Sequence, residues 1–182
     1  MPYKASAVLR CLPELTLGHS RFALLALRDR MGTVFYKRAT FVTHLPETHL
    51  YTQSHNWLSK VSADAKVWRV GYTKFALRML GELVDVQFDR KAQEAIQVGD
   101  ILGTIEGFKA ISDLFSVASG RFVRANPELA SKLEAIAEKP YDEGWLYEVE
   151  GEPDARAMDV NGYRSLLDAT IDRMLQKEQE QR

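Results

Sequence analysis

The sequence predicts a mainly β fold with peripheral helices, and two observations carry this prediction. Short runs rich in β-branched and aromatic residues recur along most of the 182-residue chain, each bounded by glycine or short polar residues. Helical patterns are few, and they fall at residues 73–81, 126–140 and 160–178. Many short strands with few helices are typical of a small β-sandwich or barrel.

The most distinct local signal is a β-hairpin in the middle of the chain. Residues 100–105 and 114–117 are expected to be strands on either side of a turn, and residues 121–123 a further strand. This places Lys109 at the tip, where a lysine is solvated and sterically open. Taken alone, such a lysine is most often only a solubilising surface residue.

The first part of the chain, residues 1–48, has a biased charge. Residues 1–46 contain seven lysines or arginines and two acids, a bias typical of an organellar transit peptide. Against that interpretation, residues 33–36 and 39–43 have the composition of short strands. Residues 1–48 are therefore either a transit peptide or an N-terminal addition packed onto a domain that occupies residues 49–182. A secretory signal is not expected, because no basic start leads into an uninterrupted apolar core.

Strand and helix signals alternate in the first half of that domain. Residues 67–71 predict a strand, and Thr73 is a plausible N-cap for a brief helix that ends at Gly81. Residues 83–88 predict the next strand. A polar loop at residues 89–97 then leads to the hairpin.

The second half closes with two predicted helices around a strand. Asn126 and Pro127 form a helix-start signature, and apolar residues keep helical spacing up to Pro140. Residues 145–149 predict a closing strand, and an apolar stripe predicts a C-terminal helix over 160–178. The stripe consists of Tyr163, Leu166, Leu167, Ile171 and Leu175. The sequence indicates neither a linker nor a second core.

Composition excludes several classes of protein. A formal net charge of -1 argues against a nucleic-acid or anionic-membrane binder, since those carry clustered lysine and arginine. The single cysteine, Cys11, cannot form an internal disulfide. The longest apolar run near the start, residues 22–27, is far shorter than the roughly 18 residues of a membrane span. We therefore expect a soluble protein with no nucleic-acid or membrane partner.

The hairpin and four further blocks resemble one family. Residues 106–113, Glu-Gly-Phe-Lys-Ala-Ile-Ser-Asp, are similar to the Glu-Ser-Val-Lys-Ala-Ala-Ser-Asp hairpin of glycine cleavage system H proteins. The other blocks follow in the family's order at residues 51–57, 80–86, 119–126 and 140–146. The second of these, Leu-Gly-Glu-Leu-Val-Asp-Val, is similar to Leu-Gly-Asp-Leu-Val-Phe-Val in the family. The resemblance covers roughly residues 50 to 175.

The resemblance implies a fold, a cofactor and a site. The fold is a barrel-sandwich hybrid of the lipoyl/biotinyl-carrier type with a C-terminal helix. Lys109 carries lipoic acid in amide linkage, and a lipoylating enzyme recognises the hairpin through Glu106, Gly107 and Asp113. Biotin is disfavoured, because biotin carriers place the lysine between two methionines, which this hairpin does not have.

Each of the three recognition residues also has a purely structural interpretation. Glu106 is otherwise a cross-strand partner for a lysine or arginine. Gly107 accommodates the backbone in the turn, and Asp113 caps it.

The function implied is that of a non-enzymatic carrier in the glycine cleavage system. Its partners are glycine decarboxylase, which uses pyridoxal phosphate, aminomethyltransferase, dihydrolipoyl dehydrogenase and the lipoylating enzyme. The expected location is the cytoplasm, with the mitochondrial matrix as the alternative. Two other functions stay open, namely an H-like carrier or lipoyl relay for a different lipoate-dependent complex, and an unlipoylated scaffold domain.

The chain departs from the family at the cleft that holds the loaded arm. Where the family has an acid in Ser-His-Glu-Trp this chain has Asn56, and where it has Asp-His it has Lys74 and Phe75. The loss of a carboxylate and the gain of a lysine are expected to weaken the binding of a cationic aminomethyl group. His55 follows the family pattern and is expected to be structural, and no metal-ligand cluster is visible among the four histidines.

Overall fold

A computed structural model of the chain describes residues 32–63, 66–108 and 110–181, and Gly32–Arg182 form one compact unit. The transit-peptide interpretation concerns residues that lie mostly outside this part of the chain. None of the helices within the described ranges has both the length and the apolar character that crossing a bilayer requires.

The described chain begins with an antiparallel hairpin of β1 (Thr33–Arg38) and β2 (Phe41–Pro46). The two strands predicted at 33–36 and 39–43 are confirmed, and both are longer than predicted. Ala39 has a φ of 50° in the tight turn between them, a left-handed conformation common in two-residue hairpin turns.

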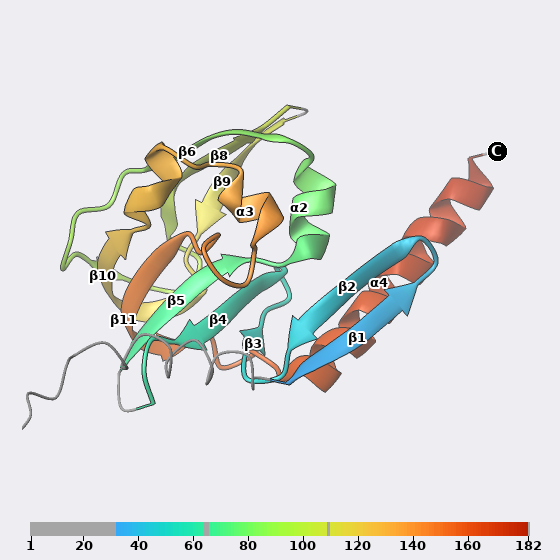
Figure 1. The fold of residues 1–182 in the computed structure, drawn as a ribbon, viewed down its shortest axis with the longest axis horizontal. Coiled ribbons are helices and arrows are strands. Elements are labelled where there is room, and N and C mark those ends of the chain that lie inside the picture. Colours follow the sequence, from blue (N-terminus) through green and yellow to red (C-terminus); the bar gives the residue numbers. More distant parts are fainter. Residues whose placement is uncertain (1–31, 64–65, 109, 182) are drawn as a thin grey trace, which may run out of the picture. The chain divides into compact units, whose positions relative to one another are not determined.

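Two further sheets build the body of the fold, and all their strand pairs are antiparallel (Figure 1). The six-stranded sheet contains, in spatial order, β3 (Leu50–Tyr51), β4 (Asn56–Lys60), β5 (Val67–Tyr72), β11 (Tyr147–Pro153), β10 (Ala118–Ala125) and β7 (Ala95–Ile96). The three-stranded sheet contains β6 (Leu83–Phe88), β8 (Ile101–Gly107) and β9 (Ala110–Phe115). This is the mainly β arrangement that the sequence predicts. Strands β3, β4 and β7 were not predicted, since each is very short or lies in a polar stretch.

The brief helix α2 (Lys74–Leu80) has the predicted ends. The Thr73 side chain accepts a hydrogen bond from the Ala76 N–H, and Gly81 ends the helix with a φ of 82°. A left-handed residue at that point favours glycine, because it has no Cβ to clash with the backbone.

The single helix predicted between Asn126 and Pro140 is wrong. Two short pieces stand there instead, a 3₁₀ helix η1 (Pro127–Ala130) and α3 (Ala135–Glu138). Asn126 does cap η1 by accepting a hydrogen bond from the Glu128 N–H. The Ser131 N–H then bonds back only three residues, so the turn closes as 3₁₀ and the helix ends.

The buried side chains form two hydrophobic clusters, whereas the sequence predicted one core. The first cluster lies between the two larger sheets and joins residues of both, including Leu58, Val70, Leu102, Leu114 and Val149. The second cluster joins β1, β2, β3, β4, α2 and the C-terminal helix α4 (Val160–Glu180). The sequence did not indicate the second cluster, because its members come from segments that are far apart along the chain.

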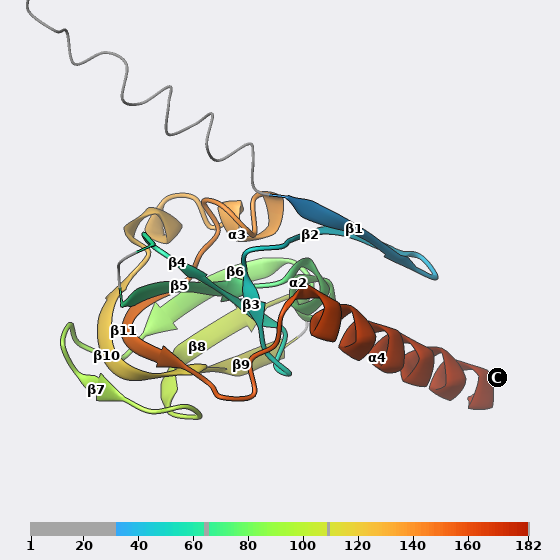
Figure 2. The same ribbon diagram turned by 90° about the horizontal axis from the view of Figure 1, so that it is seen from below.

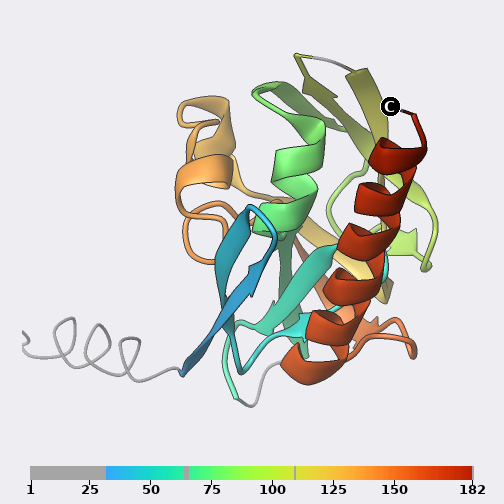
Figure 3. The same cartoon turned by 90° about the vertical axis from the view of Figure 1, so that its right-hand side faces the viewer.

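Helix α4 confirms the predicted C-terminal helix and lies beside the β1–β2 hairpin (Figures 2 and 3). Tyr163, Leu167 and Ile171 of the apolar stripe are buried against the hairpin and β3. Polar contacts border this packing, with the Tyr36 hydroxyl donating to Asp168 at 2.8 Å and Arg38 bound to Asp172. Residues 32–48 are thus held against the C-terminal helix, and the division of the chain at residue 48 stays a prediction.

Candidate functional site

The predicted hairpin is present and consists of β8 and β9. Their register closes with Gly107 opposite Ala110, so Phe108 and Lys109 are the two residues that join the strands. Phe108 is 81% exposed and Ile111 is 68% exposed. Lys109 lies outside the described residues, so the predicted lipoyl attachment point stays a prediction, although the residues around it lie at an exposed tip.

Gly107 fixes the base of this hairpin against the end of α2. A Cβ added there would lie 2.6 Å from the carbonyl oxygen of Leu80, closer than carbon and oxygen can approach. The next residue, Phe108, donates its N–H to the carbonyl of Glu82 at 2.8 Å. The glycine is therefore needed by the packing of the hairpin, and its role in enzyme recognition stays a prediction.

The register shows what lies opposite Glu106 and Asp113. Glu106 lies in β8 directly opposite Asp85 on one side and Ile111 on the other, so neither of these two partners is a lysine or arginine, and pairing with a basic residue stays a prediction. Asp113 lies exposed within β9 opposite Thr104, away from the turn, so the capping role is wrong. Recognition by a lipoylating enzyme stays a prediction for both.

These residues give the outer face of the three-stranded sheet an acidic character. Asp85, Glu106 and Asp113 come from three adjacent strands, and in the register of β6, β8 and β9 none of them lies opposite a lysine or arginine. A set of carboxylates beside an exposed tip favours partners with a basic surface.

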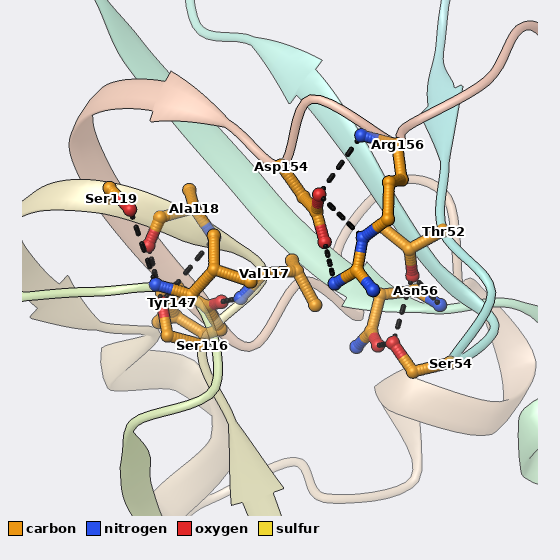
Figure 4. A network of polar contacts seen from close by, with 11 residues as sticks. Thr52, Ser54, Asn56, Ser116, Val117, Ala118, Ser119, Tyr147, Asp154 and Arg156 are labelled. Carbon is orange, nitrogen blue, oxygen red and sulfur yellow. Dashed lines mark hydrogen bonds and ion pairs between the residues drawn. The ribbon is translucent and has the colours of Figure 1, made fainter.

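The first residue that departs from the family motif, Asn56, is buried and hydrogen-bonded within the domain. Asn56 is 4% exposed, and its side-chain oxygen accepts a hydrogen bond from the Ser54 hydroxyl at 2.9 Å. Its N–H donates to the Thr52 hydroxyl at 3.1 Å. Asn56 thus completes a small, partly buried network within the β3–β4 turn (Figure 4).

A cavity of about 240 Å³ adjoins this network and contains an ion pair. Arg156 holds the Asp154 carboxylate with both Nε, at 3.1 Å, and Nη2, at 2.8 Å. These hydrogen bonds lower the pKa of Asp154. Figure 4 shows the Arg156 side chain between Asp154 and the Thr52–Ser54–Asn56 cluster. The carboxylate in this cavity is therefore already neutralised.

The other two departures lie on α2, which begins two residues after Tyr72, the strand partner of Asn56. Phe75 is buried and packs edge-on against Phe41 of β2, with 5.4 Å between ring centroids. Lys74 is exposed, and its backbone N–H donates to the Tyr141 hydroxyl at 3.3 Å. Phe75 contacts the residue before Asn56, since its ring lies 4.6 Å from that of His55. The contact between Phe41 and Phe75 was missed, and the only signal for it was the aromatic content of residues 35–41.

Two described histidines, the buried His49 and the half-buried His55, serve the packing of the domain. His55 has a φ of 61°, and its Nδ1 lies 3.0 Å from the Tyr163 hydroxyl, which also lies 2.8 Å from Thr73 Oγ1. His49 packs against Trp57 with 5.0 Å between ring centroids. Burial lowers the pKa of each histidine to about 4. Within the described ranges, no three side chains of histidine, cysteine, aspartate or glutamate are grouped as metal ligands.

Comparison with known proteins identifies the family to which this sequence is similar. The family model for the glycine cleavage H-protein matches residues 49–174. The glycine cleavage system H protein of Kocuria rhizophila is 37% identical over 130 residues, which are 70% of this chain and 100% of that protein. The corresponding protein of Corynebacterium jeikeium is 33% identical over 125 residues, 68% of this chain and 98% of its own length.

A solved structure is similar as well. The crystal structure of a glycine cleavage system H protein from Mycobacterium marinum has a TM-score of 0.59 and 32% sequence identity. The match covers 66% of this chain and 97% of that one. It confirms the predicted barrel-sandwich fold of the lipoyl-carrier type. By sequence match, relatives and fold, the chain belongs to the glycine cleavage H-protein family.

Proposed function

We propose that the chain is a lipoyl carrier of the glycine cleavage system, with lipoic acid amide-linked to Lys109. In this role it presents the aminomethyl group of glycine in turn to glycine decarboxylase, aminomethyltransferase and dihydrolipoyl dehydrogenase. When bound, lipoic acid supplies a disulfide/dithiol couple that accepts a fragment together with two electrons. The chain itself catalyses no step.

The observation that carries this proposal is the exposed hairpin tip within the family match. Phe108 and Ile111 flank the lysine in sequence, and both are largely exposed. A lipoylating enzyme must enclose its target lysine, and a protruding two-residue connection between strands suits that requirement. Glu106 and Asp113 offer carboxylates on the neighbouring sheet face for recognition, and Gly107 keeps the hairpin base in place.

The strands that support the hairpin tip also suit the role of a carrier. Antiparallel pairing of β8 with both β6 and β9 fixes the strands that lead to the lysine. A long arm on a fixed tip raises the effective concentration of its sulfur atoms at each partner's active site. We place this carrier domain at residues 49–182, with residues 1–48 as an addition to it. The proposed location is the cytoplasm, with the mitochondrial matrix as the alternative.

A second candidate is an H-like carrier for a different lipoate-dependent complex, or a relay of lipoyl groups to other acceptors. The burial of Asn56 and Phe75 favours it, since the family's polar cleft residues are replaced here by packing residues. Lipoylation is common to both candidates, whereas the carried group differs.

A reconstituted glycine cleavage assay separates the two candidates. The lipoylated chain is combined with the decarboxylase, the aminomethyltransferase and the dehydrogenase, and carbon dioxide release from glycine is measured. The proposal expects activity that depends on the chain, is lost in Lys109→Arg and is kept in the control Lys91→Arg. A fully lipoylated chain that supports no release would support the second candidate instead.

A further inference from the structure

The α2–α4 groove, between the β1–β2 turn, α2 and α4, is the open end of the second hydrophobic cluster. It has a volume of about 200 Å³. Its lining is mostly apolar and includes Phe41, Phe75, Met79, Ile171, Met174 and Leu175. Three of these side chains are buried in the cluster, whereas Met79 is 53% exposed and Leu175 is 37% exposed. A single chain therefore leaves apolar surface at this groove in contact with water.

The groove is built in part by segments outside the family match. The match spans residues 49–174, whereas β1, β2 and residues 175–180 of α4 lie beyond it. The hairpin is fixed on α4 by buried side chains, Tyr36 and Leu45 among them. In Figure 1 the hairpin and the end of α4 extend away from the two larger sheets. The carrier fold alone therefore does not explain the groove.

Arg78 of α2 gives one side of the groove a positive charge. Its guanidinium group lies 5.8 Å from the centroid of the Phe41 ring and donates to the Thr40 hydroxyl oxygen at 3.0 Å. Among the described residues, no carboxylate forms an ion pair with it. The positive charge of Arg78 is therefore available to a partner at the groove.

The other side of the groove is acidic. Glu178 lies near the end of α4, lines the groove and is exposed. Arg38, the second arginine of the lining, is already paired with Asp168 and Asp172. A small anion or a small cation suits this groove poorly, because Glu178 repels the first and Arg78 repels the second. The groove instead matches a partner that carries both charges.

A second copy of the chain carries both charges in the required arrangement. A two-fold axis that passes between Arg78 and Glu178 places the Arg78 of each copy toward the Glu178 of the other. The exposed Met79 and Leu175 of the two copies then meet near the axis, and methionine adapts readily to an irregular gap. An apolar centre with charged residues around it is the usual arrangement of a specific interface.

We propose that the α2–α4 groove is the interface of a homodimer, with Met79 and Leu175 at its centre and pairs of Arg78 with Glu178 between the copies. A stable dimer buries roughly 1,200–2,000 Å² in total, so the contact includes the exposed ends of α4 and of the hairpin beside the groove. No described residue of β8 or β9 lines the groove, so the lysine hairpin takes no part in it. The inference goes beyond the proposed function and does not rest on it.

Sedimentation of the full chain over a range of concentrations tests the dimer. We expect the measured mass to rise from that of one chain to that of two. Met79→Glu is expected to weaken association about tenfold or more, because two carboxylates then face each other near the axis. The control is Val84→Glu, since Val84 is 54% exposed in β6 and does not line the groove. A chain that stays monomeric, or a Met79→Glu variant that associates as well as the control, would overturn the inference.

Exchange of the two charges tests the orientation of the copies. Arg78→Glu and Glu178→Arg are each expected to weaken association about tenfold, since each change acts at two places in a two-fold dimer. The double variant Arg78→Glu/Glu178→Arg restores opposite charges and is expected to associate as tightly as the unmodified chain. Its recovery also excludes misfolding as the cause of the loss in the single variants. A double variant that associates no better than the single ones argues against this interface and overturns it.

Methionine methyl signals locate the contact without any substitution. Met79 and Met174 line the groove, whereas Met158 pairs with Tyr51 of β3 and serves as the control. The first two signals are expected to shift as the protein concentration rises, and the third is expected to stay.

The same signals report a different occupant of the groove. If the chain remains monomeric and the Met79 and Met174 signals shift only when a glycine cleavage enzyme is added, the groove binds that enzyme and the second-copy inference is overturned. Lipoylation of Lys109 is measured by mass and does not depend on either outcome, so failure of this inference is distinguishable from failure of the proposed function.

Discussion

A close contact at the candidate site involves a residue with no side chain, Gly107. An alanine there would place its Cβ 2.6 Å from the Leu80 carbonyl, so the hairpin base and the end of α2 would have to separate. Overpacking of this kind costs about 1–3 kcal/mol. We expect Gly107→Ala to lower the free energy of unfolding by that amount, measured by urea denaturation. Ser112→Ala, an exposed change in β9, is the control, and equal losses would show that the contact does not matter.

The buried His49 and the half-buried His55 predict how stability depends on pH. Burial lowers the pKa of His49 and of His55 from 6.5 to about 4. Between these values the unfolded chain binds protons that the folded chain does not, so the free energy of unfolding decreases as the pH falls from 6.5 to 4. Each histidine contributes about 1.4 kcal/mol per pH unit to this decrease.

Substitution of one histidine tests this prediction. Denaturation of the unmodified chain, His49→Gln and His44→Gln is followed at several pH values between 4 and 7. In His49→Gln the free energy of unfolding is expected to depend less steeply on pH, and the difference is the contribution of one histidine. His44→Gln, at an exposed position, is the control for the loss of an imidazole. A slope unaltered by His49→Gln would show that this ring does not remain neutral in the fold.

At the scale of elements, α4 is held by apolar packing more than by charge. Leu167 is 0% exposed within the second cluster, and Leu-to-Ala changes at such positions cost about 2–5 kcal/mol. The Arg38–Asp172 ion pair is 42% and 43% exposed, and pairs of that kind are worth about 0–1 kcal/mol. Leu167→Ala is expected to lower the melting temperature by several degrees more than Asp172→Asn. Comparable losses in the two variants would contradict this ranking.

The elements also show what local sequence can predict. The ends of α2 were predictable because Thr73 and Gly81 carry the capping signals themselves. The β8–β9 hairpin was predictable because both strands and the turn are contiguous in sequence. The division into η1 and α3 was not, because a 3₁₀ turn and an α-helix share the same start signal at Asn126 and Pro127.

At the scale of the whole molecule, the predictable part is the domain that the family motifs cover. Other features depend on segments that are distant in sequence, and no periodic pattern in the sequence predicts them. Examples are the contact of Phe41 with Phe75 and the burial of Asn56. The same holds for the cavity of about 390 Å³ lined by residues of β6 and η1, which needs these two elements to come together. Sequence therefore indicated the lysine and its hairpin, whereas the packing around them required the fold.

The central claim is that Lys109 is lipoylated, and intact-mass measurement after co-expression with a lipoylating enzyme and lipoic acid tests it most directly. The account predicts that the chain gains the mass of one lipoyl group, that Lys74→Arg gains it equally and that Lys109→Arg does not. A chain that keeps its unmodified mass when a known carrier in the same cells is fully lipoylated would contradict the account.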